Sequence, residues 1–282
     1  MVRNMYLIAV AMGIMTTATN AHETELSDSS CLRYIANEGV MISSGDAKVL
    51  FDAFYEDSYG QYALVREQTR AALMDGTPPY DDIDALFVSH VHGDHFSAAP
   101  TLEFLQKNPA VSLFASAQVI TALKKEDGAD DISDRLKAFS LAAGDPPQEL
   151  GFGPIDIDVV RIPHAGGPGR ADIENLAFRV TLDKAYTVLH MGDADPADRH
   201  FAPHQSHWDA KPLDMALPPY WFFANDVGRS IVDDRLKAKD AIGIHVPIAA
   251  ASEGDRWEIR YGAALFTEPG ETKEITNGGC AL

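Results

Sequence analysis

Three histidines and an aspartate lie within six positions of this chain, and this cluster limits its fold more than any other stretch. His90, His92, Asp94 and His95 directly follow the apolar residues 83–88, which predicts a strand that passes into a loop. Imidazole nitrogen and carboxylate oxygen bind Zn²⁺ and related divalent ions, and hydrolytic sites keep one position open for water. In a turn that leaves a strand, His90 and His92 can converge on one ion while Asp94 and His95 face a second. The sequence therefore predicts a metal site at a strand end.

Further metal-binding side chains recur at other strand exits. His164, Asp193 and His245 each follow a short apolar segment with the pattern of a strand. In layered α/β folds, loops at strand ends converge without disturbing the core, so functional sites gather there. One isolated histidine after a strand is more often a surface residue than a ligand. Four such exits in one chain indicate a shared metal site.

Strand and helix patterns alternate along the chain, which predicts a layered α/β fold. The predicted strands cover residues 34–42, 48–51, 83–88, 111–115, 155–159, 176–182, 186–190, 213–217 and 241–245, and the predicted helical segments cover residues 55–74, 97–106, 119–123 and 229–239. The strands at 176–182 and 186–190 are expected to form a hairpin. In the strand that begins at Ile155, Asp156 and Asp158 alternate with apolar residues, which predicts one solvated face.

The complete pattern resembles the metallo-β-lactamase-fold hydrolase superfamily over most of the chain. The resemblance rests on a first strand pair that ends at Asp52, the signature His-x-His-x-Asp-His, and the later His164, Gly192-Asp193 and His245. It implies a four-layer αββα sandwich that holds two divalent metal ions, with zinc expected and manganese or iron as alternatives. By motif position, the resemblance implies that the first ion is held by His90, His92 and His164, the second by Asp94, His95 and His245, and that Asp193 bridges them.

The expected function is that of a dinuclear metal-dependent hydrolase. The sequence holds neither a G-x-S-x-G elbow nor an H-E-x-x-H helix, so a metal-bridging hydroxide is the expected nucleophile. Asp94 is the expected catalytic residue, because it can orient the water or accept its proton. Small esters, lactones, thioesters and phosphodiesters are the expected substrates. β-Lactam hydrolysis is disfavoured, since zinc β-lactamases generally lack a bridging aspartate at the position of Asp193.

Two other functions stay open from the sequence. A non-catalytic metal-binding protein of the same fold would use the same ligands for storage or structural closure. Redox chemistry at a di-iron site would need a partner electron donor, and the chain shows no flavin-binding segment.

Composition argues for one acidic domain. The 282 residues are 46% hydrophobic and no Pro/Gly/Ser-rich linker divides them, so residues 22–282 are expected to form a single domain. The formal net charge is −19. Proteins that bind nucleic acid or anionic lipid carry a basic surface, so this composition argues against both partners. A small-molecule substrate is therefore the expected partner.

The first residues resemble an export signal. Arg3 precedes an apolar core at 5–15 and the small residues 16–21, which predicts a signal peptide over residues 1–21 and a periplasmic or secreted protein. The alternative is an uncleaved N-terminal anchor; no later segment has the length and apolarity of a membrane helix. Cys31 and Cys280 are expected either to pair in an oxidising compartment or to stay reduced.

Several other polar and aromatic residues allow two interpretations. Asp52 either steadies the histidine loop or is a solvated acid, and His190 is expected in the core or behind the ligands. His200, His204 and His207 are expected to be solvated or at a pocket mouth, although their spacing also suits a separate metal patch. The aromatic residues 220–222 either belong to the core or form a wall of the substrate pocket. Residues 166–169 are expected to form a turn, not a phosphate-binding loop.

Overall fold

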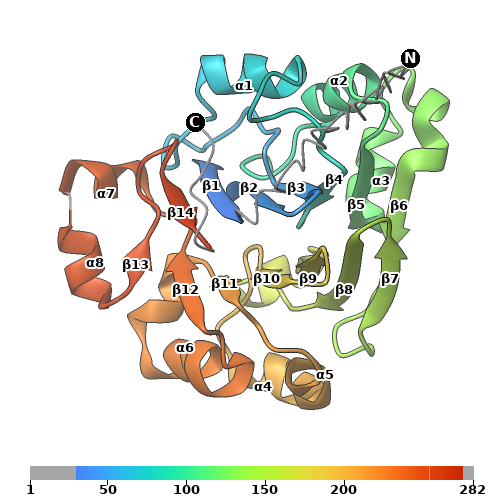
Figure 1. Cartoon of the computed structure of the whole chain (residues 1–282). Coiled ribbons are helices and arrows are strands. Elements are labelled where there is room, and N and C mark those ends of the chain that lie inside the picture. The colour runs from blue at the N-terminus through green and yellow to red at the C-terminus, as the bar shows by residue number, and fades with distance from the viewer. Residues whose placement is uncertain (1–29, 254, 276–282) are drawn as a thin grey trace, which may run out of the picture.

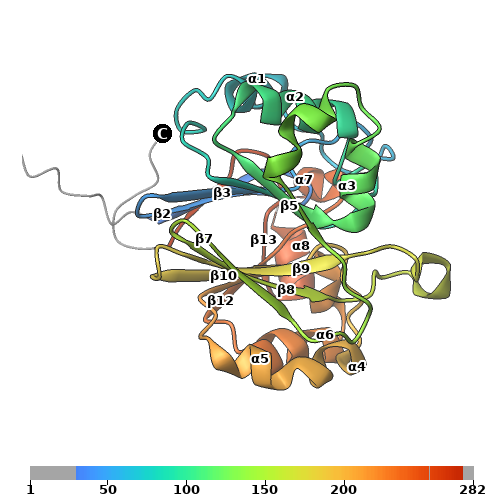
Figure 2. The ribbon, with the colours of Figure 1, turned by 90° about the vertical axis from the view of Figure 1, so that its right-hand side faces the viewer.

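The computed structural model describes residues 30–253 and 255–275. In this part of the chain two mixed sheets lie face to face, with helices on both outer sides (Figure 2). The first sheet has the strand order β14 (Thr272–Glu274), β1 (Cys31–Ala36), β2 (Gly39–Ser44), β3 (Ala47–Phe51), β4 (Ala85–Val88), β5 (Ser112–Ser116) and β6 (Leu136–Phe139). The second has the order β13 (Ala264–Leu265), β12 (Asp240–Gly243), β11 (Met215–Leu217), β10 (Tyr186–His190), β9 (Leu176–Leu182), β8 (Ile155–Arg161) and β7 (Gln148–Phe152). The predicted αββα sandwich is confirmed.

The helices cover the outer face of each sheet (Figures 1 and 2). The first sheet is covered by α1 (Glu67–Met74), α2 (Ala98–Lys107) and α3 (Ala117–Leu123), and the second by α4 (Asp198–Phe201), α5 (Gln205–Ala210) and α6 (Asp226–Ser230). Helices α7 (Ile248–Glu253) and α8 (Arg256–Tyr261) lie beside the sandwich (Figure 1). Short 3-10 segments occupy Ala129–Arg135, Gly167–Arg170, Ala202–His204 and Tyr220–Ala224, and one π-helical turn occupies Ile231–Leu236.

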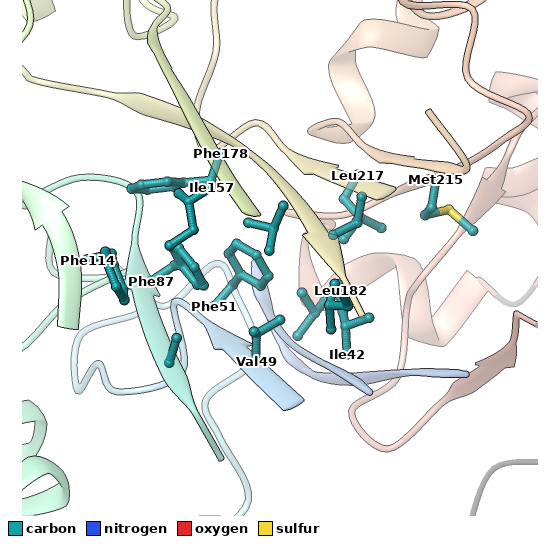
Figure 3. Close-up of a cluster of buried hydrophobic side chains, with 14 of the residues drawn as sticks. Ile42, Val49, Phe51, Phe87, Phe114, Ile157, Phe178, Leu182, Met215 and Leu217 are labelled. Carbon is teal, nitrogen blue, oxygen red and sulfur yellow. The ribbon is translucent and has the colours of Figure 1, made fainter. Parts of the chain in front are cut away.

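The main core lies between the two sheets (Figure 3). Side chains alternate along each strand, so Phe51 and Phe87 point inward while Leu50 and Leu86 pack under the outer helices. The Phe87 ring lies 4.8 Å from that of Phe51 and 5.1 Å, across the interface, from that of Phe178. Such aromatic pairs add roughly 0.5–1.5 kcal/mol each beyond the buried area. The sandwich thereby gives the strand ends a rigid base.

Parallel strands at the centre of each sheet bring the predicted site loops to one region. In the first sheet β3, β4 and β5 are parallel neighbours, and in the second β10, β11 and β12 are. The carboxyl ends of parallel strands meet at one edge of a sheet, which is where loops can converge on a ligand. The loops that follow β4, β10 and β12 carry His90, Asp193 and His245.

Three predicted elements differ in the structure. The strand expected at 34–42 is two strands joined by a turn at Asn37 and Glu38, because Asn37 takes a left-handed conformation with φ 52°. Only the last part of 55–74 is helical, as α1. The helix expected at 229–239 is divided between α6 and the π-helical turn, and Lys237, with φ 53°, follows its end.

The predicted signal segment 1–21 and Cys280 lie outside the described residues. Cys31 carries no free thiol. Among residues 30–253 and 255–275, no helix combines the length and apolar character needed to cross a bilayer.

Candidate metal centre

The structure brings all seven predicted ligand residues into one buried cluster. Four come from the loop after β4, and the others follow β8, β10 and β12. Their side chains fall into two groups whose potential ligand atoms lie within 4.8 Å of one another: His90, His92, His164 and Asp193, and Asp94, His95 and His245. All are buried except His92, which is half-exposed.

The first group presents three imidazole nitrogens and one carboxylate oxygen to a common point. His92 Nδ1 lies 3.0 Å from His90 Nε2 and 3.0 Å from His164 Nε2. Asp193 Oδ2 lies 3.1 Å from His164 Nε2 and 4.0 Å from His90 Nε2. Nitrogens this close repel one another unless a proton or a cation lies between them, so the arrangement suits a shared metal ion.

The second group lies on the other side of Asp193. Its Oδ1 is 3.1 Å from His245 Nε2 and 3.4 Å from His95 Nε2. Asp94 Oδ2 is 3.3 Å from His245 Nε2 and 3.7 Å from His95 Nε2. The two oxygens of Asp193 are therefore divided between the two groups.

Asp193 owes its position to the residues around the exit of β10. Gly192 has φ +51°, and a Cβ there would lie 2.3 Å from Asn175 Oδ1 and 2.8 Å from Ser89 Cβ. Asn175 is fully buried and accepts a hydrogen bond from the Asp193 backbone N–H while its amide donates to the Met191 carbonyl. Any side chain at position 192 would displace this contact.

A buried hydrogen-bond network fixes the histidines of the first loop. Asp52 accepts hydrogen bonds from the Ser89 N–H and from the Ser89 hydroxyl, and lies 2.9 Å from His95 Nδ1. Because the Ser89 proton goes to Asp52, the Ser89 oxygen, 3.0 Å from His90 Nδ1, accepts from that ring. Both imidazoles therefore direct Nε2, the nitrogen that a metal ion would bind, toward the cluster. Of the two alternatives for Asp52, the structure therefore supports the one in which it steadies the histidine loop, and not the solvated acid.

The other two histidines are held by their own loops. His164 Nδ1 donates to the Ala165 carbonyl, so its Nε2 faces Asp193. His245 has φ 59°, a strained conformation for a histidine, and its N–H donates to the Asn37 carbonyl at 3.0 Å. Backbone strain of this kind is retained where the surroundings over-determine it, and it clusters at functional sites.

Burial and charge set the protonation of the cluster. Burial lowers the pKa of His90 well below its usual value, and burial and the neighbouring His164 lower the pKa of His92 to about 4. Both rings are neutral ligands at neutral pH. Burial also acts to lower the pKa of His95, but the carboxylates of Asp193 and Asp52 outweigh it and raise that pKa well above the usual value. The cluster therefore attracts positive charge.

Several buried polar atoms of the cluster lack a hydrogen-bond partner among the described residues. They are His95 Nε2, His245 Nε2, His245 Nδ1 and Asp193 Oδ1. A buried polar atom without a partner costs roughly 1–3 kcal/mol, and native structures avoid such atoms. Three of these atoms point at one another, which is the arrangement that a divalent cation would satisfy. The donor set therefore fits metal ions.

Sequence reasoning missed three residues that surround the cluster. Glu38 is fully buried beside His95 and His190, Asn175 holds Asp193, and Ser89 joins Asp52 to the histidine loop. Ser89 precedes the first histidine and could have been found from that position. The other two have no local signal, because their partners are distant in the sequence.

His190 lies in the core, as expected, and the aromatic segment contributes both to the core and to a wall beside the cluster. His190 is fully buried, stacks on Phe51 at 4.8 Å, and donates from Nε2 to the Glu38 carbonyl. Phe222 belongs to the core. Trp221 instead lies 5.2 Å from the His245 ring and Tyr62 lies 4.1 Å from it, both half-buried. These two aromatic residues form a wall beside the cluster.

The expectation that His200, His204 and His207 are solvated or at a pocket mouth is wrong for the last two. His204 and His207 are buried under the second sheet, and His207 accepts a hydrogen bond from Arg179 through its Nδ1. Asp158, expected on a solvated face, is also buried, 2.8 Å from Arg179 Nε. Helix α5 covers this face of the strand at Asp158, which forms a buried ion pair, whereas Asp156 on the same face is exposed as expected. Residues 166–169 form a turn in which Gly166, with φ 100°, precedes the 3-10 segment Gly167–Arg170.

Comparison with solved structures supports the fold. Similar proteins include Igni18, a metallo hydrolase from the archaeon Ignicoccus hospitalis, with 14% identity, 87% of this chain and 98% of that chain covered, and a TM-score of 0.56. An isothiocyanate hydrolase from Delia radicum gut bacteria has 14% identity, coverage of 86% and 98%, and a TM-score of 0.55. The diiron β-hydroxylase CmlA from Streptomyces venezuelae has 13% identity, coverage of 88% and 54%, and a TM-score of 0.54. At these identities the likeness shows the fold alone.

Comparison with protein families covers most of the chain. No curated protein sequence matches it. The family described as the beta-lactamase superfamily domain matches residues 47–245, which include every residue of the two ligand groups. The fold, the strand-end cluster and this match together show that the chain belongs to the metallo-β-lactamase superfamily of metal-dependent hydrolases.

Proposed function

We propose that this protein is a dinuclear metal-dependent hydrolase that acts on a small ester, lactone, thioester or phosphodiester. The observation that carries the proposal is Asp193, whose Oδ2 faces His164 and whose Oδ1 faces His245. A carboxylate shared in this way is the natural bridge between two cations. Zinc is the ion we expect, with manganese or iron as alternatives, because imidazole and carboxylate ligands suit all three.

The ions would supply the reactive water and polarise the substrate carbonyl or phosphoryl oxygen. The chain's own residues would then accept the proton that the attacking water releases. Asp94 Oδ2 lies among the second group, where burial raises its pKa but the adjacent imidazoles of His245 and His95 outweigh this and lower it. Asp94 is thus an ionised acceptor at neutral pH, and we assign to it the orientation of the attacking water and the acceptance of its proton.

The substrate would enter beside the aromatic wall. Trp221 uses its indole N–H on the Ala194 carbonyl at 3.1 Å, which leaves its ring face for apolar contact. Tyr62 lies on the same histidine from another loop. We therefore expect a small organic substrate with an apolar group beside the scissile bond. The acidic charge of the chain disfavours nucleic acid as a partner.

We also propose that the protein works outside the cytoplasm, as a periplasmic or secreted enzyme. The proposal rests on the basic, apolar and small-residue order of residues 1–21. Sequencing the mature N-terminus would test it: a start after the small residues is expected, and a start at Met1 would contradict it.

Chelation and reconstitution test the enzymatic proposal. Activity on a panel of esters, lactones, thioesters, phosphodiesters, β-lactams and isothiocyanates is expected to disappear with a chelator and to return with Zn²⁺ or Mn²⁺. The variant His92→Ala should lose activity by roughly 10–100-fold or more, because it removes a first-group nitrogen at a half-exposed position that the fold tolerates.

His200→Ala, which changes a histidine outside both ligand groups, is the matched control and should retain activity. Full activity in a folded His92→Ala protein would contradict the proposal. Metal uptake without turnover across the whole panel would favour a non-catalytic metal-binding protein, and native iron together with oxidation of a substrate would favour redox chemistry.

A further inference from the structure

Glu38 is a fully buried carboxylate directly behind the second ligand group. It lies in the turn between β1 and β2, and neither Oε1 nor Oε2 has a hydrogen-bond partner among residues 30–253 and 255–275. Burying an unpaired acidic group is costly, so a protein that retains one usually gives it a cation or a donor. The environment of Glu38 therefore requires an explanation.

The carboxylate of Glu38 lies close to Asp193 and His245. One of its oxygens, one Asp193 oxygen and one His245 nitrogen lie within 4.8 Å of one another. Asp193 Oδ1 and His245 Nε2 are themselves without hydrogen-bond partners. Three separate loops thus bring buried polar side chains that have atoms without hydrogen-bond partners close together.

The neighbouring imidazole donors are already used by other acceptors. His95 Nδ1 lies 3.7 Å from Glu38 Oε2 but 2.9 Å from Asp52, and His190 Nε2 donates to the Glu38 carbonyl at 2.9 Å and lies 3.8 Å from Oε2. The carboxylate is therefore not needed to orient either ring. This leaves its oxygens available to the cluster.

The turn that carries Glu38 is fixed to the metal loops. Asn37 donates from Nδ2 to the Asp94 carbonyl at 2.9 Å and accepts from the His245 N–H at 3.0 Å. The backbone of the turn thus moves with two of the loops that hold the second group. A carboxylate positioned by such contacts is held within reach of an ion there.

We propose that Glu38 is an additional ligand of the second metal ion, an inference that rests on the proposed dinuclear site. The second ion would then be surrounded by the carboxylates of Asp94, Asp193 and Glu38 and the imidazoles of His95 and His245. The first has one carboxylate and three imidazoles. Oxygen-rich sites favour Mn²⁺ over Zn²⁺ relative to nitrogen-rich ones, so the two positions should differ in metal preference.

The test compares Glu38→Gln with the wild type and with Glu56→Gln, the same change at an exposed carboxylate paired to Arg70. Equilibrium dialysis against Mn²⁺ and against Zn²⁺, followed by elemental analysis, gives the affinity for each ion. Glu38→Gln should bind the first ion as the wild type does and the second at least about tenfold more weakly, with the larger loss for Mn²⁺. Glu56→Gln should match the wild type.

Thermal unfolding in EDTA separates ligation from a structural role. A glutamine fills the same space without the acid, so the metal-free Glu38→Gln protein should melt at or above the wild-type temperature. Unchanged affinity for both ions, or a lower melting temperature in EDTA without a selective loss of the second ion, would overturn the inference. A wild-type protein that binds no metal would overturn both proposals, whereas two bound ions and a selective Glu38→Gln effect without any turnover would contradict the hydrolase alone.

Discussion

At the scale of the residue, the site depends on which nitrogen each imidazole offers. Asp52 and Ser89 settle this for His90 and His95, because they accept the Nδ1 protons and leave both Nε2 atoms for the cluster. The network is buried and fully joined, so its loss would affect the metal rather than the surface.

Asp52→Asn tests this network. Asp52 has φ 38°, a conformation that asparagine tolerates, so the backbone should be kept while the charge that fixes His95 is lost. We expect metal affinity, measured by competition with a chelating dye, to fall roughly 10–100-fold, with activity restored by excess metal. Asp46→Asn, in the exposed turn between β2 and β3, should behave as the wild type. Wild-type metal affinity in Asp52→Asn would contradict the role given to this residue.

At the scale of the element, the strands of the second sheet that lead to the site are held by contacts with each other and with the helix that covers them. Asp158 on β8 and Arg179 on β9 form a buried ion pair, and Arg179 also donates to the His207 carbonyl of α5. The contacts join two strands to the helix that covers them. Strand β8 leads directly to His164, so this pair supports one side of the site.

Asp158→Asn should therefore destabilise the protein. Removing one partner leaves the Arg179 charge buried and unpaired, which costs about 3–5 kcal/mol in other proteins. Urea unfolding of the metal-free protein should show a loss of this size. Asp156→Asn, two positions away on the exposed face of the same strand, should leave the unfolding free energy unchanged. Equal stability of the two variants would show that the ion pair has no net effect.

The sequence predicted those elements and site residues whose signals are local. Period-two alternation revealed β8, the expected hairpin at 176–182 and 186–190 is confirmed as β9 and β10, and the dense spacing of His90 to His95 revealed the main loop. The sequence did not reveal the turn at Asn37, because the turn depends on one left-handed residue within an otherwise apolar segment. Glu38 and His207 were missed or misplaced for a related reason: their burial depends on elements far away in the chain.

At the scale of the whole molecule, the two sheets act as one frame for the cluster. The first ligand group joins the loop after β4 in one sheet to the exits of β8 and β10 in the other. The second group adds the exit of β12. The packed aromatic core between the sheets fixes the distance across which these loops must reach (Figure 3). Metal ions bound there would link both halves of the sandwich.

Crystals of the protein grown with Mn²⁺ or Zn²⁺ and measured by anomalous diffraction test the central claim most directly. We predict two anomalous peaks about 3.5–4 Å apart, one on each side of Asp193, the first beside His92 and the second beside His245. A single peak, or two peaks of which neither contacts Asp193, would contradict the dinuclear site.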